Sequence, residues 1–169
     1  MEKIAVLIGD GFEDAELLYP YYRMREAGFQ VELVGPEKDV VYRGKHGVPM
    51  RSTTVASEAL MADYVAVIIP GGRAPDRLRL NRDLVRLARQ AMDRDKVVAA
   101  ICHGPQILIE ADVVRGRQAT CYASVATDLK NAGALYTDQE VVVDGNLVTS
   151  RTPADLPAFC REILRLLAR

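Results

Sequence analysis

The stretch VVAAICHGPQILIE at residues 97–110 decides the fold class and the candidate chemistry of this chain. Its first five residues are small or β-branched and apolar, which is typical of a buried strand. Cys102 and His103 follow directly, and an apolar helical pattern begins after Gly104 and Pro105. This order predicts a nucleophile elbow, a sharp strand-to-helix turn that lifts one side chain clear of the backbone. Because N–H groups at a helix start favour an anion, we expect the Cys102 thiol to ionise more easily than a free thiol.

Length and composition suit one compact domain spanning residues 1–169. The chain is 49% hydrophobic and has a formal net charge of −1, so no overall field favours nucleic acid or an anionic membrane. The stretch 73–94 holds seven arginines, but aspartates interrupt it. This interleaving favours a solvated helix face over a nucleic-acid site. We therefore expect neither nucleic-acid scaffold binding nor membrane association.

The N-terminus, the lack of a long apolar run and the cysteines predict a cytoplasmic setting. The N-terminus enters a strand pattern almost at once, without the pattern of a signal peptide, and no apolar run is long enough to cross a bilayer. The three cysteines are widely spaced and form neither a disulfide framework nor a metal cluster. We expect no metal and no cofactor.

Strand and helix patterns alternate along the chain, which predicts an α/β sandwich with a mostly parallel sheet and helices on both faces. In the first half we expect strands at residues 3–9, 30–35, 64–69 and 97–101, with a hairpin excursion at 40–51. An amphipathic helix at 14–27 is expected to be broken by Pro20, and Asn81 is expected to cap a later helix. In the second half, short strands are expected at 118–122, 134–136, 141–143 and 147–149, before a terminal helix at 154–168.

Unusual residues follow three of the expected strands. In open parallel sheets, ligands bind beyond the carboxyl ends of the strands, so residues at these ends should share one edge. The three segments are Gly9 to Asp14, Pro70 to Arg73 and Cys102 to Gly104. Their convergence predicts one site.

An active thiol needs a partner that stabilises its anion. The only histidines are His46 and His103, so no histidine far downstream of Cys102 can act as a base. His103 could reach the thiol if the turn is sharp, and a protonated Glu13 could donate a hydrogen bond to the thiolate.

Backbone groups complete the expected site. The N–H groups of Gly71, Gly72 and His103 are candidates for an oxyanion hole, since glycine permits close approach.

Several of these residues have simpler interpretations. Cys102 could be a small buried hydrophobic residue, although the elbow favours a catalytic or redox role. Cys160 lies on an apolar helical stripe and fits the core, while Cys121 could be structural or near the site. Glu13 could only complement a helix N-terminus, and His46 fits a solvated loop.

Segments throughout the chain resemble the PfpI branch of the ThiJ/PfpI superfamily. They are FEDAELLYPYYR, GKHG, IIPGGRAPDRLR, AAICHGPQIL, the segment at Tyr122 and VVVDGNLVTSR. The resemblance implies a flavodoxin-like fold related to class I glutamine amidotransferases. It implies that Cys102 is the nucleophile, His103 its partner and Glu13 the carboxyl group that touches the cysteine, with oxyanion-hole amides at Gly72 and His103.

Two positions depart from the family pattern. A family glutamate after Gly-Gly-Arg-Ala-Pro reaches the histidine of a neighbouring subunit, and this chain has the shorter Asp76 there. Thr152 stands where some relatives have histidine. Tyr122 and Arg151 are expected to line the substrate pocket.

The resemblance implies a cysteine-dependent, peptidase-like hydrolase in stress defence that forms a homodimer or a larger homo-oligomer. Its substrate would be a peptide, or a small carbonyl or glycated compound. One alternative is a glyoxalase III or protein deglycase acting on methylglyoxal or glycated adducts. Another is a non-enzymatic sensor of oxidative stress through oxidation of Cys102.

Overall fold

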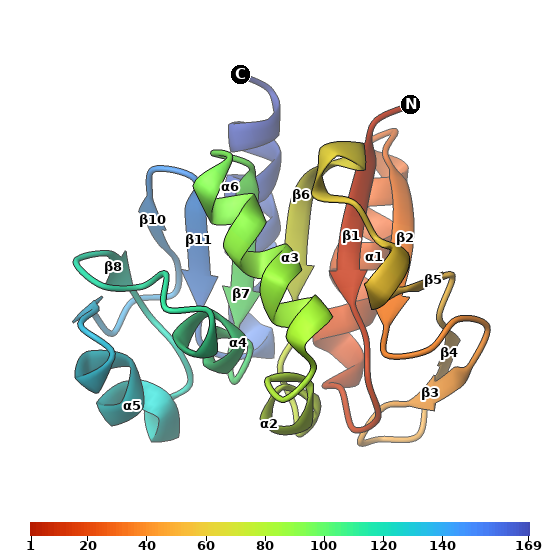
Figure 1. Ribbon diagram of the computed structural model, residues 1–169. Coiled ribbons are helices and arrows are strands. Elements are labelled where there is room, and N and C mark those ends of the chain that lie inside the picture. The colour runs from red at the N-terminus through yellow and green to blue at the C-terminus, as the bar shows by residue number, and fades with distance from the viewer.

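A seven-stranded sheet forms the centre of the computed structural model, which describes residues 1–169 (Figure 1). All neighbouring strands pair in parallel except β10 and β11, which form an antiparallel hairpin at one edge. In spatial order the strands are β10 (Val142–Asp144), β11 (Leu147–Ser150), β7 (Val97–Ile101), β6 (Tyr64–Ile69), β1 (Lys3–Leu7), β2 (Gln30–Gly35) and β5 (Thr54–Val55). The mostly parallel α/β architecture is therefore confirmed.

Helices cover both faces of this sheet (Figure 1). The helices α1 (Asp14–Glu26) and α6 (Leu156–Leu167) pack together on one face, while α3 (Arg82–Asp93) and α4 (Pro105–Glu110) pack together on the other. Two short helices, α2 (Ala74–Leu78) and α5 (Ala126–Asn131), lie in the connections. None of these helices combines the length and apolar composition that membrane crossing requires.

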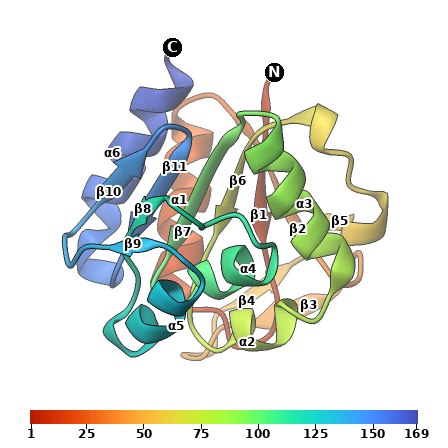
Figure 2. The ribbon, with the colours of Figure 1, turned by 60° about the vertical axis from the view of Figure 1, so that its left-hand side comes forward.

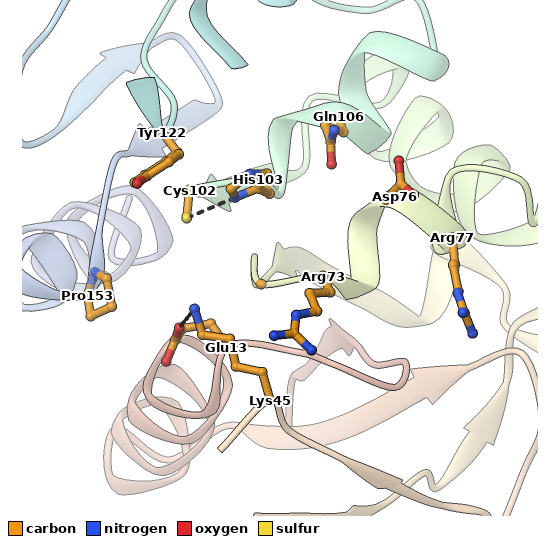
Figure 3. Close-up of a pocket in the computed structure, with 11 residues that line it drawn as sticks. Glu13, Lys45, Arg73, Asp76, Arg77, Cys102, His103, Gln106, Tyr122 and Pro153 are labelled. Carbon is orange, nitrogen blue, oxygen red and sulfur yellow. Dashed lines mark hydrogen bonds and ion pairs between the residues drawn. The ribbon is translucent and has the colours of Figure 1, made fainter. Parts of the chain in front are cut away.

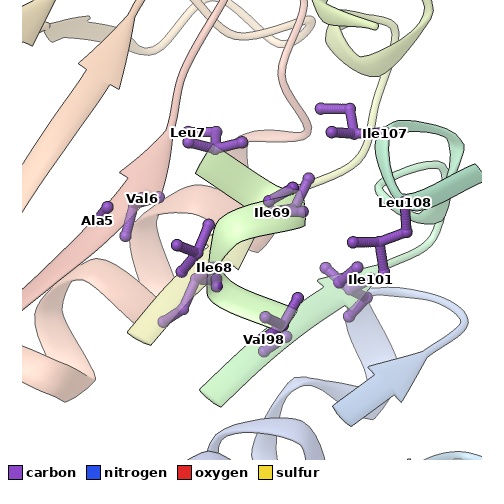
Figure 4. Close-up of a cluster of buried hydrophobic side chains, with 14 of the residues drawn as sticks. Ala5, Val6, Leu7, Ile68, Ile69, Val98, Ile101, Ile107 and Leu108 are labelled. Atoms are coloured by element: carbon purple, nitrogen blue, oxygen red, sulfur yellow. The ribbon is translucent and has the colours of Figure 1, made fainter. Parts of the chain in front are cut away.

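The strands β6 and β7 are apolar along their whole length because helices bury them from both sides. Residues from three neighbouring strands and from α4 meet in the core cluster that Figure 4 draws. Its labelled members are Ala5, Val6, Leu7, Ile68, Ile69, Val98, Ile101, Ile107 and Leu108. This packing fixes the strand ends on which the candidate site is built.

Two small strand pairs lie outside the main sheet. The antiparallel pair β3 (Val41–Arg43) and β4 (Pro49–Arg51) forms the expected hairpin excursion. The parallel pair β8 (Gln118–Ala119) and β9 (Leu135–Tyr136) lies with α5 beside the β10–β11 hairpin (Figure 2). Four short 3₁₀ turns, η1 (Ala56–Glu58), η2 (Met61–Asp63), η3 (Ala123–Val125) and η4 (Pro153–Asp155), complete the chain.

The prediction that Pro20 breaks the first helix was wrong. Helix α1 runs through this buried proline. Proline lacks the N–H that would bond the carbonyl of Glu16, but packing against the core compensates for one lost hydrogen bond. The strand expected to reach Tyr122 ends at Ala119, and the terminal helix begins with the turn η4. The helices α2 and α5 were not predicted, since both are too short to give a periodic pattern.

Candidate active site

Cys102 lies on a sharp turn between β7 and α4, as the elbow pattern predicted. Its φ of +62° is in the left-handed region that few side chains adopt. Backbone hydrogen bonds hold the residue from both sides, since its N–H donates to Ser150 O at 3.0 Å and its carbonyl accepts from Tyr122 N–H at 2.9 Å. Gly104 permits the turn, because a Cβ there would lie 2.4 Å from the carbonyl oxygen of Ile69. The thiol position is therefore rigidly set.

His103 lies beside the thiol. Its Nδ1 is 3.3 Å from Cys102 Sγ, its Nε2 is 3.4 Å from Ser124 Oγ, and its ring stacks on Tyr122 with centroids 5.1 Å apart. Burial lowers the pKa of His103, as does the charge of Lys45, while Asp76 raises it. The imidazole therefore has a polar neighbour at each nitrogen. Sequence reasoning missed Ser124, because no pattern links a serine in the turn η3 to a histidine 21 positions earlier.

The buried carboxyl group next to the thiol belongs to Glu16. Its Oε1 accepts a hydrogen bond from Gly71 N–H at 2.9 Å, and its buried Oε2 has no hydrogen-bond partner. Burial and then the charge of Glu13 raise the pKa of Glu16 to about 7, whereas interaction with the Cys102 side chain lowers it. At neutral pH both the protonated and the ionised form of this carboxyl are therefore populated.

The expectation that Glu13 touches the cysteine was wrong. Glu13 precedes the first turn of α1, and its carboxylate pairs with Lys45 Nζ at 2.5 Å and lies 3.6 Å from His46 Nε2. Glu16 follows three residues later, which brings it to the same side of the helix start, one turn further in. A carboxyl within an apolar helical face was the signal in the sequence that could have identified Glu16.

The thiol is less acidic than expected from its place before a helix. Burial raises the pKa of Cys102 to about 12, and the charge of Glu16 adds to this effect. The backbone N–H groups of Gly72 and His103, together with Lys45, act in the opposite direction. Desolvation outweighs these groups because the side chain is only 8% exposed. Formation of the thiolate therefore depends on the protonation state of Glu16.

The consecutive glycines Gly71 and Gly72 lie beside the thiol, and their N–H groups interact with different side chains. The N–H of Gly72 lowers the pKa of the Cys102 thiol. Gly72 has a φ of +85°, and a Cβ there would lie 2.3 Å from Glu13 N, so no side chain fits at this position. The N–H of Gly71 is instead bonded to Glu16. The expectation that Gly71 contributes to an oxyanion hole was therefore wrong, because its donor is already used.

A cavity of about 680 Å³ lies over the thiol (Figure 3). Tyr122 and Asp76 both line it, as does Pro153. Arg151 does not, contrary to expectation, because its guanidinium bonds Asp155 at 3.0 Å and Asp138 at 3.0 Å.

The loop after β3 places Lys45 at the cavity. Both carboxylate oxygens of Asp14 accept backbone hydrogen bonds from this loop, from His46 N–H and Val48 N–H at 3.0 Å each. Burial raises the pKa of Asp14, but these hydrogen bonds outweigh it and hold the pKa below its ordinary value. Sequence reasoning missed Lys45, whose contact with Glu13 joins segments more than thirty residues apart.

The other two cysteines are buried and away from the cavity. Cys121 and Cys160 are 0% and 1% exposed, and burial raises the pKa of each thiol to about 12. Thr152 also has a structural task, since it forms a capping box with Asp155 at the start of η4. Cys102 is thus the cysteine that faces the cavity.

Known proteins resemble this chain over almost its whole length. The model of the DJ-1/PfpI family matches residues 2–166. The deglycase PfpI of Pyrococcus furiosus is 47% identical over 165 residues, which cover 98% of this chain and 99% of that protein. The putative cysteine protease YraA of Bacillus subtilis is 46% identical over 166 residues, which cover 98% of each chain.

A solved structure supports the same assignment. A two-domain protein of Anabaena variabilis, which contains DJ-1/ThiJ/PfpI-like and ferritin-like domains, matches with a TM-score of 0.98 and 44% identity. The match covers 99% of this chain and 48% of that one, so this chain spans about half the length of the two-domain protein. This chain belongs to the DJ-1/PfpI family.

Proposed function

We propose that the chain is a cysteine-dependent hydrolase of the PfpI type, in which Cys102 Sγ attacks a carbonyl carbon. The observation that carries the proposal is the 3.3 Å contact between Sγ and His103 Nδ1 at the bottom of an open cavity. A nucleophile within reach of a base is the arrangement that covalent catalysis requires. We further propose a role in stress defence, where damaged proteins or reactive carbonyls would be the substrates.

The proposed reaction has two stages. His103 or ionised Glu16 takes the thiol proton as the S–C bond forms, and the π pair of the carbonyl moves onto its oxygen. The N–H groups of Gly72 and His103 would stabilise this oxyanion. Its collapse breaks the bond to the leaving amine, which receives the proton from the group that took it from the thiol, His103 or Glu16. Water then cleaves the thioester and returns the thiol, so that one amide bond and one water give one acid and one amine.

A deglycase or glyoxalase activity is the second candidate. It is favoured by the 47% identity to the deglycase PfpI and by the thiol's small exposed fraction, since 8% exposure suits a small carbonyl better than an extended peptide.

One experiment separates these two activities. Purified protein is incubated with a fluorogenic peptide and, separately, with methylglyoxal, while D- and L-lactate are measured. Peptide cleavage that requires Cys102, without lactate, supports the peptidase. Lactate formation that is lost in Cys102→Ala supports the glyoxalase. Equal rates for Cys102→Ala and the wild type in both assays would exclude both activities.

A redox sensor is the third candidate, favoured by the buried Oε2 of Glu16 that has no hydrogen-bond partner. Peroxide oxidises a thiol stepwise to sulfenic and sulfinic acid, and a protonated Glu16 could donate a hydrogen bond to the added oxygen. Intact mass after peroxide treatment tests this candidate. Oxygen addition at Cys102 that falls in Glu16→Ala supports it, and addition elsewhere or equal addition in the variant counts against it.

We propose that residues 1–169 act as one domain in a cytoplasmic homo-oligomer. The three free cysteines suit a reducing compartment.

The exposed tyrosines Tyr19 and Tyr22 on α1 offer apolar area for a contact between copies. Asp76 could then face His103 of a neighbouring copy, in addition to its effect on His103 of its own chain. Light scattering after size-exclusion chromatography measures the assembly, and a monomer at micromolar concentration would exclude it.

A further inference from the structure

Arg73 is a cation of the cavity wall that has no partner. The cavity is lined by three cationic side chains, Lys45, Arg73 and Arg77, and by two carboxylates, Glu13 and Asp76. Lys45 is paired with Glu13, whereas Arg73 and Arg77 make neither an ion pair nor a side-chain hydrogen bond. The wall therefore carries an excess positive charge, although the whole chain has a net charge of −1.

The backbone of Arg73 is fixed although its side chain is free. An isolated β-bridge joins Phe12 and Gly72, with Arg73 N–H bonded to Gly11 O at 2.8 Å and Glu13 N–H bonded to Gly71 O at 3.0 Å. The N–H of Gly72, the residue before Arg73, lowers the pKa of Cys102. Arg73 thus follows directly after a residue whose N–H affects the nucleophile.

The two arginines of this wall point in different directions. Figure 3 shows the Arg73 side chain turned toward the open space on the side of Glu13 and Lys45, while Arg77 is turned away from Cys102. An arginine fork binds carboxylate and phosphate oxygens through two parallel hydrogen bonds. Arg73 is therefore the wall residue suited to an anionic group in the cavity that holds the thiol.

We propose that Arg73 is a specificity residue, and that the substrate is a carbonyl compound or adduct that carries a carboxylate or phosphate near the reactive carbon. This inference rests on the proposed function, because it assigns the substrate class of the same cavity. Unlike the proposed function, the inference predicts that Cys102 reacts preferentially with negatively charged reagents, which can be measured without any substrate turnover.

Alkylation of Cys102 by a matched pair of reagents tests the preference. Iodoacetate and iodoacetamide react in the same way, since the S–C bond forms, the C–I bond breaks to release iodide and the thiol proton passes to solvent. They differ in the charge of one small group. The rate ratio of the two reagents at Cys102, read by intact mass and divided by the ratio for free cysteine, reports the attraction of an anion to the thiol.

Arg73→Gln should lower this ratio by about threefold to tenfold, because it removes one nearby positive charge. Arg73→Lys should retain most of the ratio, and Arg77→Gln should change it by less than about twofold. An unchanged ratio in Arg73→Gln would overturn the proposal. An equal fall in Arg77→Gln would do so too, since the cause would then be the general field of the cavity.

A second measurement distinguishes the two anionic groups. Sodium acetate and sodium phosphate are compared, at equal ionic strength, for their ability to slow alkylation by neutral iodoacetamide. Slowing by acetate in the wild type but not in Arg73→Gln assigns a carboxylate, and the same result with phosphate assigns a phosphate. Slowing by neither overturns the subsite. If the wild type turns over neither peptide nor methylglyoxal but still shows the charge preference at Cys102, the proposed function alone is contradicted.

Discussion

The N–H of Gly71 donates a hydrogen bond of 2.9 Å to Oε1 of Glu16, which joins the end of β6 to the first turn of α1 directly beneath the nucleophile. Space for this contact exists only because residue 71 is a glycine. A Cβ there would lie 2.6 Å from Glu16 Oε1 and 2.8 Å from Cys102 Cβ. The segments that follow β1, β6 and β7 thus meet at the Glu16 carboxyl group. Its protonation should therefore influence both the stability of the protein and the reactivity of Cys102.

Glu16→Gln should change how stability depends on pH. The pKa of Glu16 is raised from 4.5 to about 7 in the folded protein, so the folded state binds more protons between these values. The stabilising effect of the protonated carboxyl is complete below about pH 4.5 and is lost as the pH rises through 7.

The variant lacks this titration. The wild type should therefore lose about 3 kcal/mol of unfolding free energy relative to Glu16→Gln between pH 4 and pH 8. Urea unfolding at several pH values measures the difference. A difference that stays constant across this range would contradict the raised pKa of Glu16.

Glu16→Gln should also lower the pKa of the Cys102 thiol. Burial is the largest cause of its raised pKa and remains, but the charge of Glu16 is removed, and the amide can still donate a hydrogen bond to the thiolate. The midpoint of iodoacetamide labelling against pH should fall by about one pH unit. His103→Gln serves as the comparison, since it leaves the carboxylate in place. A midpoint that rises in Glu16→Gln would mean that the carboxyl acts chiefly as a proton donor to the thiolate.

Ser124→Ala should slow turnover by about fivefold with little change in KM, because a side-chain hydrogen bond contributes about 1 kcal/mol. Ser124 Oγ lies 3.4 Å from His103 Nε2, so it can hold the ring with Nδ1 toward the thiol. Ser124→Thr retains the hydroxyl and should restore most of the rate. Nitrogen chemical shifts of His103 report its tautomer, and identical shifts and rates in wild type and Ser124→Ala would remove Ser124 from the positioning of the base.

Asp14→Asn should loosen the loop that carries Lys45. Asp14 accepts two backbone N–H groups from this loop, and an asparagine side chain has only one oxygen to accept them. We expect a loss of about 1–3 kcal/mol in unfolding free energy and faster tryptic cleavage after Lys45. Asp10→Asn is the matched control, since Asp10 accepts only the N–H of Arg43 and an amide oxygen can do the same. Equal cleavage of both variants would mean that Asp14 does not restrain the loop.

Local pattern was sufficient for the elements that carry the nucleophile. The apolar run 97–101 and the Gly-Pro pair after His103 predicted the turn, and Asn81 caps α3 as expected by accepting from Asp83 N–H and Leu84 N–H. Such features depend on neighbours in the chain, so the sequence displays them directly.

Contacts between distant segments were harder to predict. Glu13 and Glu16 are both carboxyl groups at the start of α1, and only the packing of Gly71 against this turn shows which one interacts with Cys102. Arg151 has a carboxylate four residues later, and Asp155 holds it outside the cavity. Burial also reversed the expected acidity of Cys102, because its desolvation depends on the whole cavity wall.

The left-handed backbone of Cys102 means that the requirements of folding and reactivity differ at this position. For the chain alone, glycine is the residue that adopts a φ of +62° without steric cost. A cysteine retained there imposes a conformational cost of about 1 kcal/mol or more, which the hydrogen bonds to Ser150 and Tyr122 offset. Relatives selected for stability alone should therefore carry glycine at the position of Cys102. The residue at this position can thus distinguish family members that use the thiol from members that keep only the fold.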